Sequence, residues 1–480
     1  MADFLTNPTK PRLTQIVSII ALIIFLPFLL FGAQQLAELV SKAAGTPASI
    51  VVNAKLQEET LNLNFYHAFA QGGEEQNDML APVLGQVKAL HPQLIRLDHL
   101  FDACSVVGKS GDQLTFDWTC LDAKVNTILA TGAKPLLALS YMPAAIAQNG
   151  PIGPPTNWND WATVVQKTIE HFSGKSGKNI SGVYYEVWNE PDLNQFGSWS
   201  LSNYLTLYEY ASRGARNAAN VNRFNLGGPA TTYFRPDWIT GLVNSGARVD
   251  FFSWHTYASN PTQYLTDQNT LSSLLKTYPS FALTPVLITE FGFTGSKSTL
   301  YGGQYAAAHT AAVIRQLLSN GVTYAFSFEP KDGPGDATTG NGWGLITHEN
   351  NGAKPKPRYY VYSFIDQMAG TRINLTGEGS WVTGFASTNS GTLRILLVNF
   401  DPNGTHNESV PVTIGNLDPG TYTYEQHYFL GQDTTTTETV TAPESQTLGS
   451  LNSGVKSNML EKQVIMPASS IVMLKLAKQP

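Results

Sequence analysis

The sequence predicts an α/β fold: a (β/α)8 TIM barrel, a C-terminal β-sandwich domain and an N-terminal transmembrane or signal segment. Between about residues 60 and 370, short apolar runs rich in β-branched residues alternate with segments of helix length. After about residue 370, short alternating strands are separated by Asp-Pro, Pro-Gly and Thr/Ser turn signals. Residues 16–33 form a largely apolar segment without a charged side chain. These observations divide the chain into residues 1–45, 46–370 and 371–480.

The N-terminal segment, residues 1–45, is predicted to contain an anchor or an export signal. Residues 16–33 carry no charge, and a helix of this length nearly spans the hydrocarbon core of a bilayer. Lys10 and Arg12 precede the run and favour a cytoplasmic stub, which places the rest of the chain outside the cytoplasm. Phe31 occupies a position where a cleavage site needs a small residue. We therefore expect a single-pass cell-membrane protein, with a secreted protein as the alternative.

Composition narrows the class of protein further. The chain has 480 residues, 42% of them hydrophobic, which is enough for more than one domain with a sizeable core. Its 30 Lys and Arg against 36 Asp and Glu argue against a basic face that binds nucleic acid. Two cysteines are too few for a disulfide scaffold or a zinc site with several thiolates. Cys104 and Cys120 bracket a turn region, and either a disulfide or two buried free thiols fits their spacing.

The predicted barrel contains about eight pairs of a strand and a helix. The strands are read as LNLNFYH, QLIRLDH, PLLALSY, GVYYEVWNE, FNLGGPA, VDFFSWHTY, PVLITEF and VTYAFSFE. Helices are expected over residues 117–131, where Asp117 can cap the first turn, over 202–217 and over 358–368. This count over roughly 300 residues matches a (β/α)8 barrel. An open doubly wound sheet is the alternative, but no GxGxxG turn follows a strand.

The segment 371–480 is predicted to be all-β. The runs TLRILLVNF, VPVTI, TYTYEQHYF and ASSIVMLKL have strand length and alternate in polarity, as in a sandwich of about 110 residues. The segment 48–55 could supply a further strand to this domain or cover the bottom of the barrel.

Two glutamates end predicted barrel strands. Glu190 ends the fourth strand and Glu290 ends the seventh. Reactive side chains in such barrels lie at the C-terminal ends of the strands, and these two strands face each other across the mouth. Each glutamate alone could cap a helix or pair with a lysine. Two carboxylates across a sugar-sized cleft are the groups that hydrolyse glycosidic bonds, at a separation of about 5 to 5.5 Å in a retaining enzyme.

The motif Trp188-Asn189-Glu190-Pro191-Asp192 after a strand, with Thr289-Glu290-Phe291 on a later one, resembles the clan A retaining glycoside hydrolases. The resemblance is closest to glycoside hydrolase family 39, with its β-xylosidase-like and endoglycosidase-like members, and extends over roughly residues 60 to 370. It implies that Glu190 is the general acid/base, Glu290 the nucleophile and Asn189 the ligand of the sugar 2-hydroxyl.

The same resemblance implies supporting residues around the nucleophile. It places Arg96 near Glu290 and makes Tyr257 a hydrogen-bond donor to Glu290. His255, in the same Trp-His-Thr-Tyr run, is expected to have a supporting role. Chemistry requires an ionised nucleophile and an acid whose pKa is raised, so donors and cations should surround Glu290.

Other residues are weaker candidates for substrate binding. His67, Asp98 and His99 sit at predicted strand ends and could reach sugar hydroxyls, although Asp98 departs from the histidine expected there in xylosidase-like members. Trp343 offers a flat face for a pyranose or packs in the core. Glu329 could touch substrate or pair with the neighbouring Lys331, and Glu186 is expected in a charged network with Arg96.

These patterns predict a retaining O-glycoside hydrolase that cleaves a poly- or oligosaccharide through a covalent glycosyl-enzyme intermediate, with the catalytic domain outside the cytoplasm. A non-catalytic carbohydrate-binding protein and a transglycosylase of cell-envelope polysaccharide assembly are the alternatives. No metal-ligand cluster, phosphate-binding loop or GxSxG elbow is found, so neither metal nor cofactor is expected. The expected partners are a carbohydrate substrate and, through the N-terminal segment, a membrane, but no nucleic acid.

Overall fold

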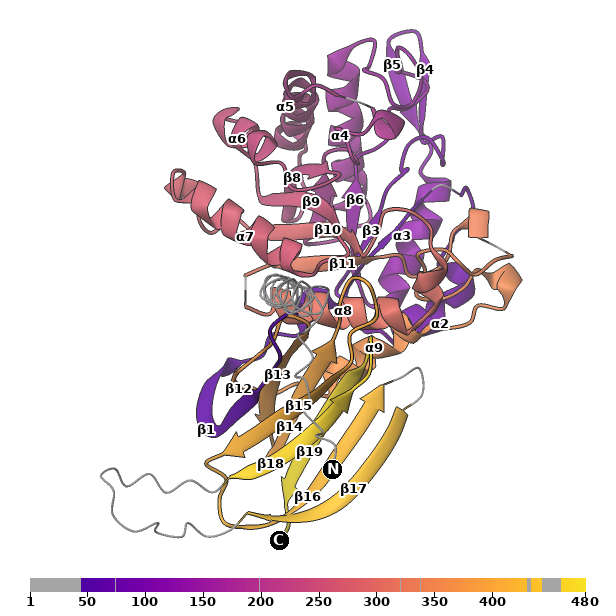
Figure 1. Ribbon diagram of the computed structural model, residues 1–480. Coiled ribbons are helices and arrows are strands. Elements are labelled where there is room, and N and C mark those ends of the chain that lie inside the picture. The colour runs from indigo at the N-terminus through magenta and orange to yellow at the C-terminus, as the bar shows by residue number, and fades with distance from the viewer. Residues whose placement is uncertain are drawn as a thin grey trace, which may run out of the picture.

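The computed structural model describes residues 45–73, 75–197, 199–319, 321–336, 338–429, 433–442 and 459–480. It contains a barrel surrounded by helices and, below it in Figure 1, a broad twisted sheet. The predicted (β/α)8 barrel and the predicted β-rich C-terminal region are thereby confirmed.

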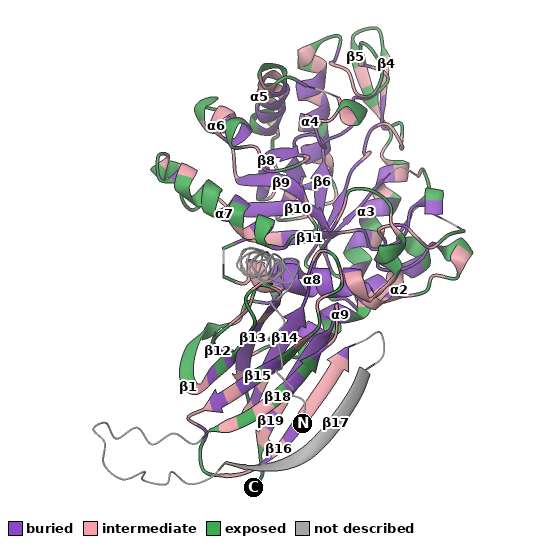
Figure 2. Ribbon diagram, in the orientation of Figure 1, coloured by how far each residue is buried: buried purple, intermediate pink, exposed green. Residues whose placement is uncertain are grey.

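Eight parallel strands close the barrel. In the order in which they pair, they are β10 (Val286–Gly292), β11 (Tyr324–Phe328), β2 (Ala68–Gln71), β3 (Leu94–Leu97), β6 (Lys134–Ala138), β7 (Val183–Glu186), β8 (Phe224–Thr231) and β9 (Phe251–Tyr257). Parallel strands are covered on both faces, which explains why they are continuous apolar runs in the sequence. The strand β10 is buried at every position, and Figure 2 shows the barrel strands largely in the colour of buried residues.

The first barrel strand begins later than the sequence predicted. The run LNLNFYH alternates in polarity, but Asn62 Oδ1 accepts a hydrogen bond from the Asn64 N–H at 3.1 Å. This Asx-turn starts a short 3₁₀ helix, Asn64–Tyr66, in place of an extended strand. The strand β2 then starts at Ala68, so His67 lies at the beginning of a barrel strand and not at its end.

One helix follows each barrel strand along the chain and contributes to the outer ring. They are α2 (Leu84–Lys88), α3 (Thr119–Thr131), α4 (Trp158–Phe172), α5 (Leu201–Asn217), α6 (Pro236–Asn244), α7 (Thr262–Leu275), α8 (Gln304–Leu317) and α9 (Pro357–Asp366). The three helices predicted from sequence begin within two residues of α3, α5 and α9. Asp117 Oδ1 accepts from the Thr119 N–H at 2.9 Å, and Ser200 Oγ accepts from the Asn203 N–H at the start of α5.

The remaining strands form one nine-stranded sheet. In pairing order they are β17 (Asp433–Ala442), β16 (Gly420–Phe429), β19 (Ile471–Lys478), β14 (Thr392–Asn399), β13 (Val382–Asn389), β12 (Thr371–Thr376), β1 (Ile50–Thr60), β15 (Glu408–Gly415) and β18 (Leu460–Met466). The segment 48–55 therefore supplies a strand to this domain. Because β1 pairs with both β12 and β15, strands expected in the two sheets of a sandwich are hydrogen-bonded as one continuous sheet.

The sheet encloses an apolar core of its own and packs its other face on the barrel. Phe385, Leu396 and Met473 belong to the same buried apolar cluster as residues of α8 and the barrel. Gln304 at the start of α8 donates to the backbone carbonyls of Phe429 and Ser469. Figure 1 shows α8 and α9 between the barrel and the sheet. One apolar cluster therefore continues from the barrel onto the inner face of the sheet, and the sheet has a second cluster of its own.

A disulfide joins Cys104 and Cys120 across the hairpin of β4 (Val107–Ser110) and β5 (Gln113–Phe116). The hairpin lies in the long connection between β3 and α3. Closing a loop of this length reduces the entropy of the unfolded chain, an effect worth about 3 kcal/mol in the chain-entropy model. The disulfide thus anchors this connection to the first turn of α3.

The predicted membrane anchor over residues 16–33 lies outside the described residues. Within the described ranges, no helix is both long and apolar enough to cross a membrane. The predicted localisation as a single-pass membrane protein is corrected on this finding.

Candidate active site

The two glutamates lie at the mouth of the barrel, which is the end where its strands have their C-termini. Glu290 is part of β10, whereas β7 ends at Glu186, four residues before Glu190. The backbone between them turns sharply, because Trp188 and Glu190 have φ values of 77° and 44°, in the left-handed region. The Glu190 N–H donates to the Ala230 carbonyl at 2.9 Å, which holds this turn against β8. Strained backbone of this kind is concentrated at functional sites.

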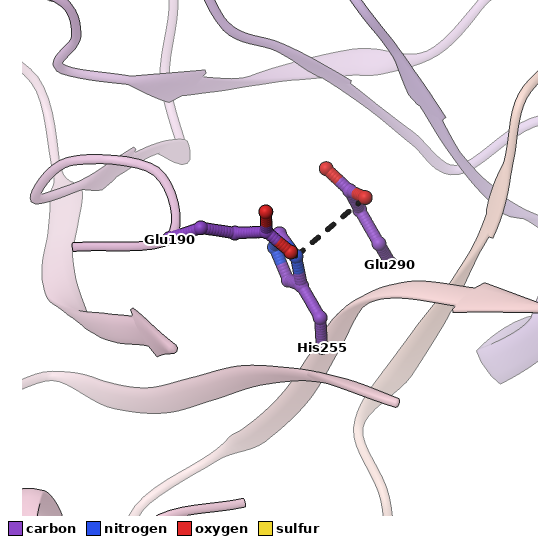
Figure 3. Close-up of side chains that lie close together, drawn as sticks. All are labelled: Glu190, His255 and Glu290. Carbon is purple, nitrogen blue, oxygen red and sulfur yellow. Dashed lines mark hydrogen bonds and ion pairs between the residues drawn. The ribbon is translucent and has the colours of Figure 1, made fainter. Parts of the chain in front are cut away.

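The two carboxylates meet at His255, which β9 contributes. One oxygen of each glutamate and one ring nitrogen of His255 all lie within 4.8 Å of one another. His255 Nδ1 lies 2.8 Å from Glu190 Oε1 and 3.5 Å from Glu290 Oε2. Figure 3 shows the imidazole ring between the two side chains. Glu190 and Glu290 are only 7% and 6% exposed.

Arg96 on β3 donates hydrogen bonds both to Glu290 and to Glu186 and Asn189, which lie just before Glu190 in the chain. Its Nε donates to Glu186 Oε2 at 2.7 Å, and its Nη1 donates to Glu290 Oε1 at 2.9 Å. Its Nη2 donates to Asn189 Oδ1 at 2.7 Å. Burial alone lowers the pKa of Arg96, but Glu186 and Glu290 more than compensate, so its pKa is raised. The guanidinium is a permanent buried cation beside Glu290.

Both oxygens of Glu290 accept a hydrogen bond. Tyr257 donates from its hydroxyl to Glu290 Oε2 at 2.6 Å, beside the Arg96 contact on Oε1. Burial raises the pKa of Glu290 above its ordinary value, and the charge of Glu190 adds to the rise. His255, Arg96 and the Tyr257 hydrogen bond lower it again in part. These groups therefore favour the ionised form against the effect of burial.

His255 is fully buried between two acids. Burial alone lowers the pKa of its imidazole, but Glu290 and the hydrogen bond to Glu190 raise it above the ordinary value. Its Nε2 has no hydrogen-bond partner among the described residues. Its contacts therefore run through Nδ1, toward the two carboxylates.

Asn189 is oriented from both ends of its amide. Arg96 donates to its oxygen, and its Nδ2 donates to the Tyr141 hydroxyl at 2.7 Å. Tyr141 in turn stacks on Phe196, with ring centroids 5.7 Å apart. The sequence analysis did not assign Tyr141 to the site. The signal was present, because Tyr141 ends the predicted strand PLLALSY, as the other site residues end theirs.

Three weaker candidates also lie at the mouth. Asp98 follows the last residue of β3, and its Oδ1 accepts from the Gly73 N–H at 2.8 Å. His99 pairs through Nδ1 with Asp102 and points the edge of its ring at Tyr141. Trp343 packs against Phe328, 5.6 Å between centroids.

Two further candidates, His67 and Glu329, make contacts that the sequence analysis did not expect. His67 lies at the opposite end of the barrel, where Nδ1 contacts the Leu90 carbonyl and Nε2 lies 2.8 Å from Asp366 Oδ1 on α9. The sequence analysis placed His67 at the end of a strand because it set the first barrel strand too far toward the N-terminus; β2 begins only at Ala68. Glu329 accepts from Gln71 at 3.0 Å and from the Gly333 N–H at 3.2 Å. Lys331, its expected partner, pairs with Glu349 instead.

The cluster of Glu190, His255 and Glu290 has a spacing that could hold a metal ion. Its ligand atoms are already engaged, since both oxygens of Glu290 accept from Arg96 and Tyr257. A buried guanidinium next to Glu290 also repels a divalent cation. The contacts of Glu290 therefore fit a hydrogen-bonded carboxylate better than a metal ligand.

Comparison with known proteins identifies the family. The model of the glycosyl hydrolases family 39 matches residues 74–408, which include the whole cluster described above. The chain belongs to this family. The resemblance inferred from the two glutamate motifs is confirmed.

Two curated relatives and one solved structure illustrate the similarity. The chain is 27% identical over 317 residues to a β-xylosidase of Caldicellulosiruptor saccharolyticus, covering 58% of this chain and 62% of the relative. It is 24% identical over 259 residues to the α-L-iduronidase of Canis lupus familiaris, covering 48% and 35%. The chain thus spans less than two thirds of these relatives. The GH39 enzyme of Xanthomonas axonopodis pv. citri has the same fold, with a TM-score of 0.71 at 18% identity over 92% of this chain and 99% of that one.

Proposed function

We propose that the protein is a retaining O-glycoside hydrolase that acts on a poly- or oligosaccharide. The observation that carries the proposal is the pair of buried carboxylates, Glu190 and Glu290, with one oxygen of each within 4.8 Å of the other and with unequal surroundings. A retaining mechanism needs carboxyl groups about 5 to 5.5 Å apart, close enough for one of them to attack the sugar directly. Membership of family 39, whose relatives include β-xylosidases and α-L-iduronidases, supports this reaction class.

In the first step, Glu290 attacks the anomeric carbon. The bond to the leaving oxygen breaks as Glu190 gives that oxygen its proton, and a glycosyl ester of Glu290 forms. Arg96 and Tyr257 hold the Glu290 carboxylate ionised and aligned before the attack. Asn189, oriented by Arg96 and Tyr141, is placed to bind the sugar 2-hydroxyl.

In the second step, the Glu190 carboxylate takes a proton from water. The water oxygen bonds to the anomeric carbon, the ester bond to Glu290 breaks, and the sugar leaves with the configuration it had in the substrate. His255 contacts the Glu190 carboxylate through Nδ1 and keeps it near the position of the leaving oxygen and of the incoming water.

The division of the chain is also part of the proposal. The barrel, up to about residue 370, carries the chemistry, and the β-rich domain after it supports the barrel. Gln304, Tyr305 and Arg315 on α8 bond to the sheet and its loops, which supports a structural role for that domain.

Hydrolysis of a panel of aryl glycosides in both anomeric configurations, followed by NMR, tests the proposal. The expected first product has the same anomeric configuration as the substrate. Inversion would overturn the retaining mechanism, and binding without turnover across the panel would favour a carbohydrate-binding protein. Adding sugar acceptors measures how much of the same glycosyl intermediate is transferred to an acceptor in place of water.

A further inference from the structure

Asp98 is the carboxylate of the mouth that the mechanism leaves without a task. It follows Leu97, the last residue of β3, and side chains alternate along a strand, so Asp98 shares a side with Arg96. Arg96 points into the barrel at Glu186 and Glu290. Asp98 therefore lies one layer closer to the opening, where a bound sugar would meet it.

The contacts of Asp98 leave one oxygen for a ligand. Its Oδ1 accepts from the Gly73 N–H at 2.8 Å, and within the described part of the chain no donor reaches Oδ2. The side chain is only 6% exposed. Burial and then the charge of Asp98 raise the pKa of Tyr141, the residue that orients Asn189. Asp98 Oδ2 does not belong to the buried side-chain atoms that lack a partner, so it remains accessible, and a sugar hydroxyl can replace water there.

The charged groups around this position include more acids than bases. Asp98, Glu186 and Glu290 are the acids, and Arg96 and His255, whose pKa is raised, are the bases. Glu190 holds a proton when the substrate binds. Each nitrogen of Arg96 already donates to a protein oxygen. Basic side chains on the surrounding loops are paired too: Lys297 with Asp336, Lys331 with Glu349 and Arg235 with Asp237.

From this placement we infer that Asp98 makes the site selective for a neutral sugar: its Oδ2 accepts a hydrogen bond from a sugar hydroxyl, and its charge disfavours a sugar that carries a carboxylate. The inference rests on the proposed hydrolase function and names the substrate class of that site. A uronic acid would bring a further negative charge next to the carboxylates of Asp98, Glu186 and Glu290, while the cations named above already have protein partners. Like charges at this range in a partly buried site reduce binding by roughly 100-fold or more.

Matched substrates test the selectivity. Pairs of aryl glycosides that differ only at C5, with a hydroxymethyl group in one and a carboxylate in the other, are compared in both anomeric configurations. For the pair that is cleaved, kcat/KM is expected to be about 100-fold higher for the neutral member or more. Equal or faster cleavage of the uronide would overturn the inference. If neither member of any pair is cleaved, the hydrolase proposal fails, and binding of the matched thioglycosides then tests the charge selectivity separately.

Asp98→Asn tests the residue itself, because the amide keeps the shape and removes the charge. We expect kcat/KM on the neutral substrate to fall about 10-fold, mainly through KM, and the discrimination against the uronide to shrink by at least as much. Asp418→Asn, an exposed aspartate of the β-rich domain, is the matched control and should change neither value. An Asp98→Asn protein that melts like the wild type and keeps the full discrimination would overturn the role of Asp98.

Discussion

The two sides of the cleft present the same functional group in different surroundings. On one side, Glu290 belongs to a regular strand and receives hydrogen bonds from Arg96 and Tyr257 on its two oxygens. On the other side, Glu190 lies beyond the end of β7 on left-handed backbone, and its carboxylate contacts His255. The difference teaches that the role of a carboxylate is set by its neighbours: a strand with strong donors suits a fixed anion, and a turn with one histidine suits a group that gains and loses a proton.

The largest loss of activity is expected when Glu290, the glutamate on the regular strand β10, is replaced. Glu290→Gln keeps the shape but removes the nucleophile, so hydrolysis should fall by about 10⁴-fold or more. Steady-state kinetics on an activated aryl glycoside measures the loss. Glu461→Gln, an exposed position on β18, is the matched control and should behave like the wild type. Substantial turnover by a folded Glu290→Gln protein would mean that the two sides do not differ in the proposed way.

The loss of Glu190, the glutamate on the turn after β7, should have a different effect on activity. Glu190→Ala should lose about 10²- to 10⁴-fold on substrates with poor leaving groups, and less on activated ones that need no proton. Azide should restore turnover by attacking the glycosyl ester of Glu290, giving a glycosyl azide with the substrate's configuration. NMR of the product checks this, and wild-type enzyme with azide is the control. A failure of azide to restore turnover on an activated substrate would count against the acid/base role.

The two hydrogen-bond donors to Glu290, Arg96 and Tyr257, can be removed one at a time. Tyr257→Phe deletes a hydrogen bond to a charged oxygen, so kcat/KM should fall by roughly 10- to 100-fold. Because the Tyr257 hydrogen bond lowers the pKa of Glu290, its removal raises that pKa. The acidic limb of the kcat/KM profile should therefore move to higher pH. Tyr360→Phe, at an exposed position on α9, controls for the loss of a hydroxyl. An unshifted acidic limb would show that Tyr257 does not stabilise the ionised Glu290.

Many of the residues on both sides of the cleft could be predicted from the sequence, because the reactive side chains of such a barrel lie at the C-terminal ends of its strands. Glu190 and Glu290 were found in this way, and Arg96 and Tyr257 followed from the family resemblance. Tyr141 also ends a predicted strand, but it was not assigned a role, because its hydrogen bond to Asn189, 48 residues away, is not visible in the sequence. Such a contact depends on how β6 and β7 pair, and composition and periodicity carry no information about it.

Other failures came from local structure that competes with the hydrophobic pattern. The alternation in LNLNFYH is that of a strand, yet the Asn62 side chain starts a turn there. The join between β1 and the C-terminal sheet was one of the two alternatives predicted for the segment 48–55, and it pairs residues more than 300 positions apart, such as Val52 with Leu375. Long-range pairing is decided by packing of the whole chain, so the sequence could only offer two alternatives for this segment.

The smallest effect on activity is expected at the other end of the barrel, away from both carboxylates. His67→Ala removes the contacts to the Leu90 carbonyl and to Asp366, so the free energy of unfolding should fall by about 1 to 3 kcal/mol. Because the described side-chain contacts of His67 run to Leu90, Asp366 and the rings of Tyr66 and Tyr362, away from the cleft, kcat/KM should stay within about two-fold of the wild type once the protein is folded. Denaturant unfolding and steady-state kinetics on the same preparation measure the two quantities. A large loss of kcat/KM without a loss of stability would show that the bottom of the barrel takes part in setting the geometry of the cleft.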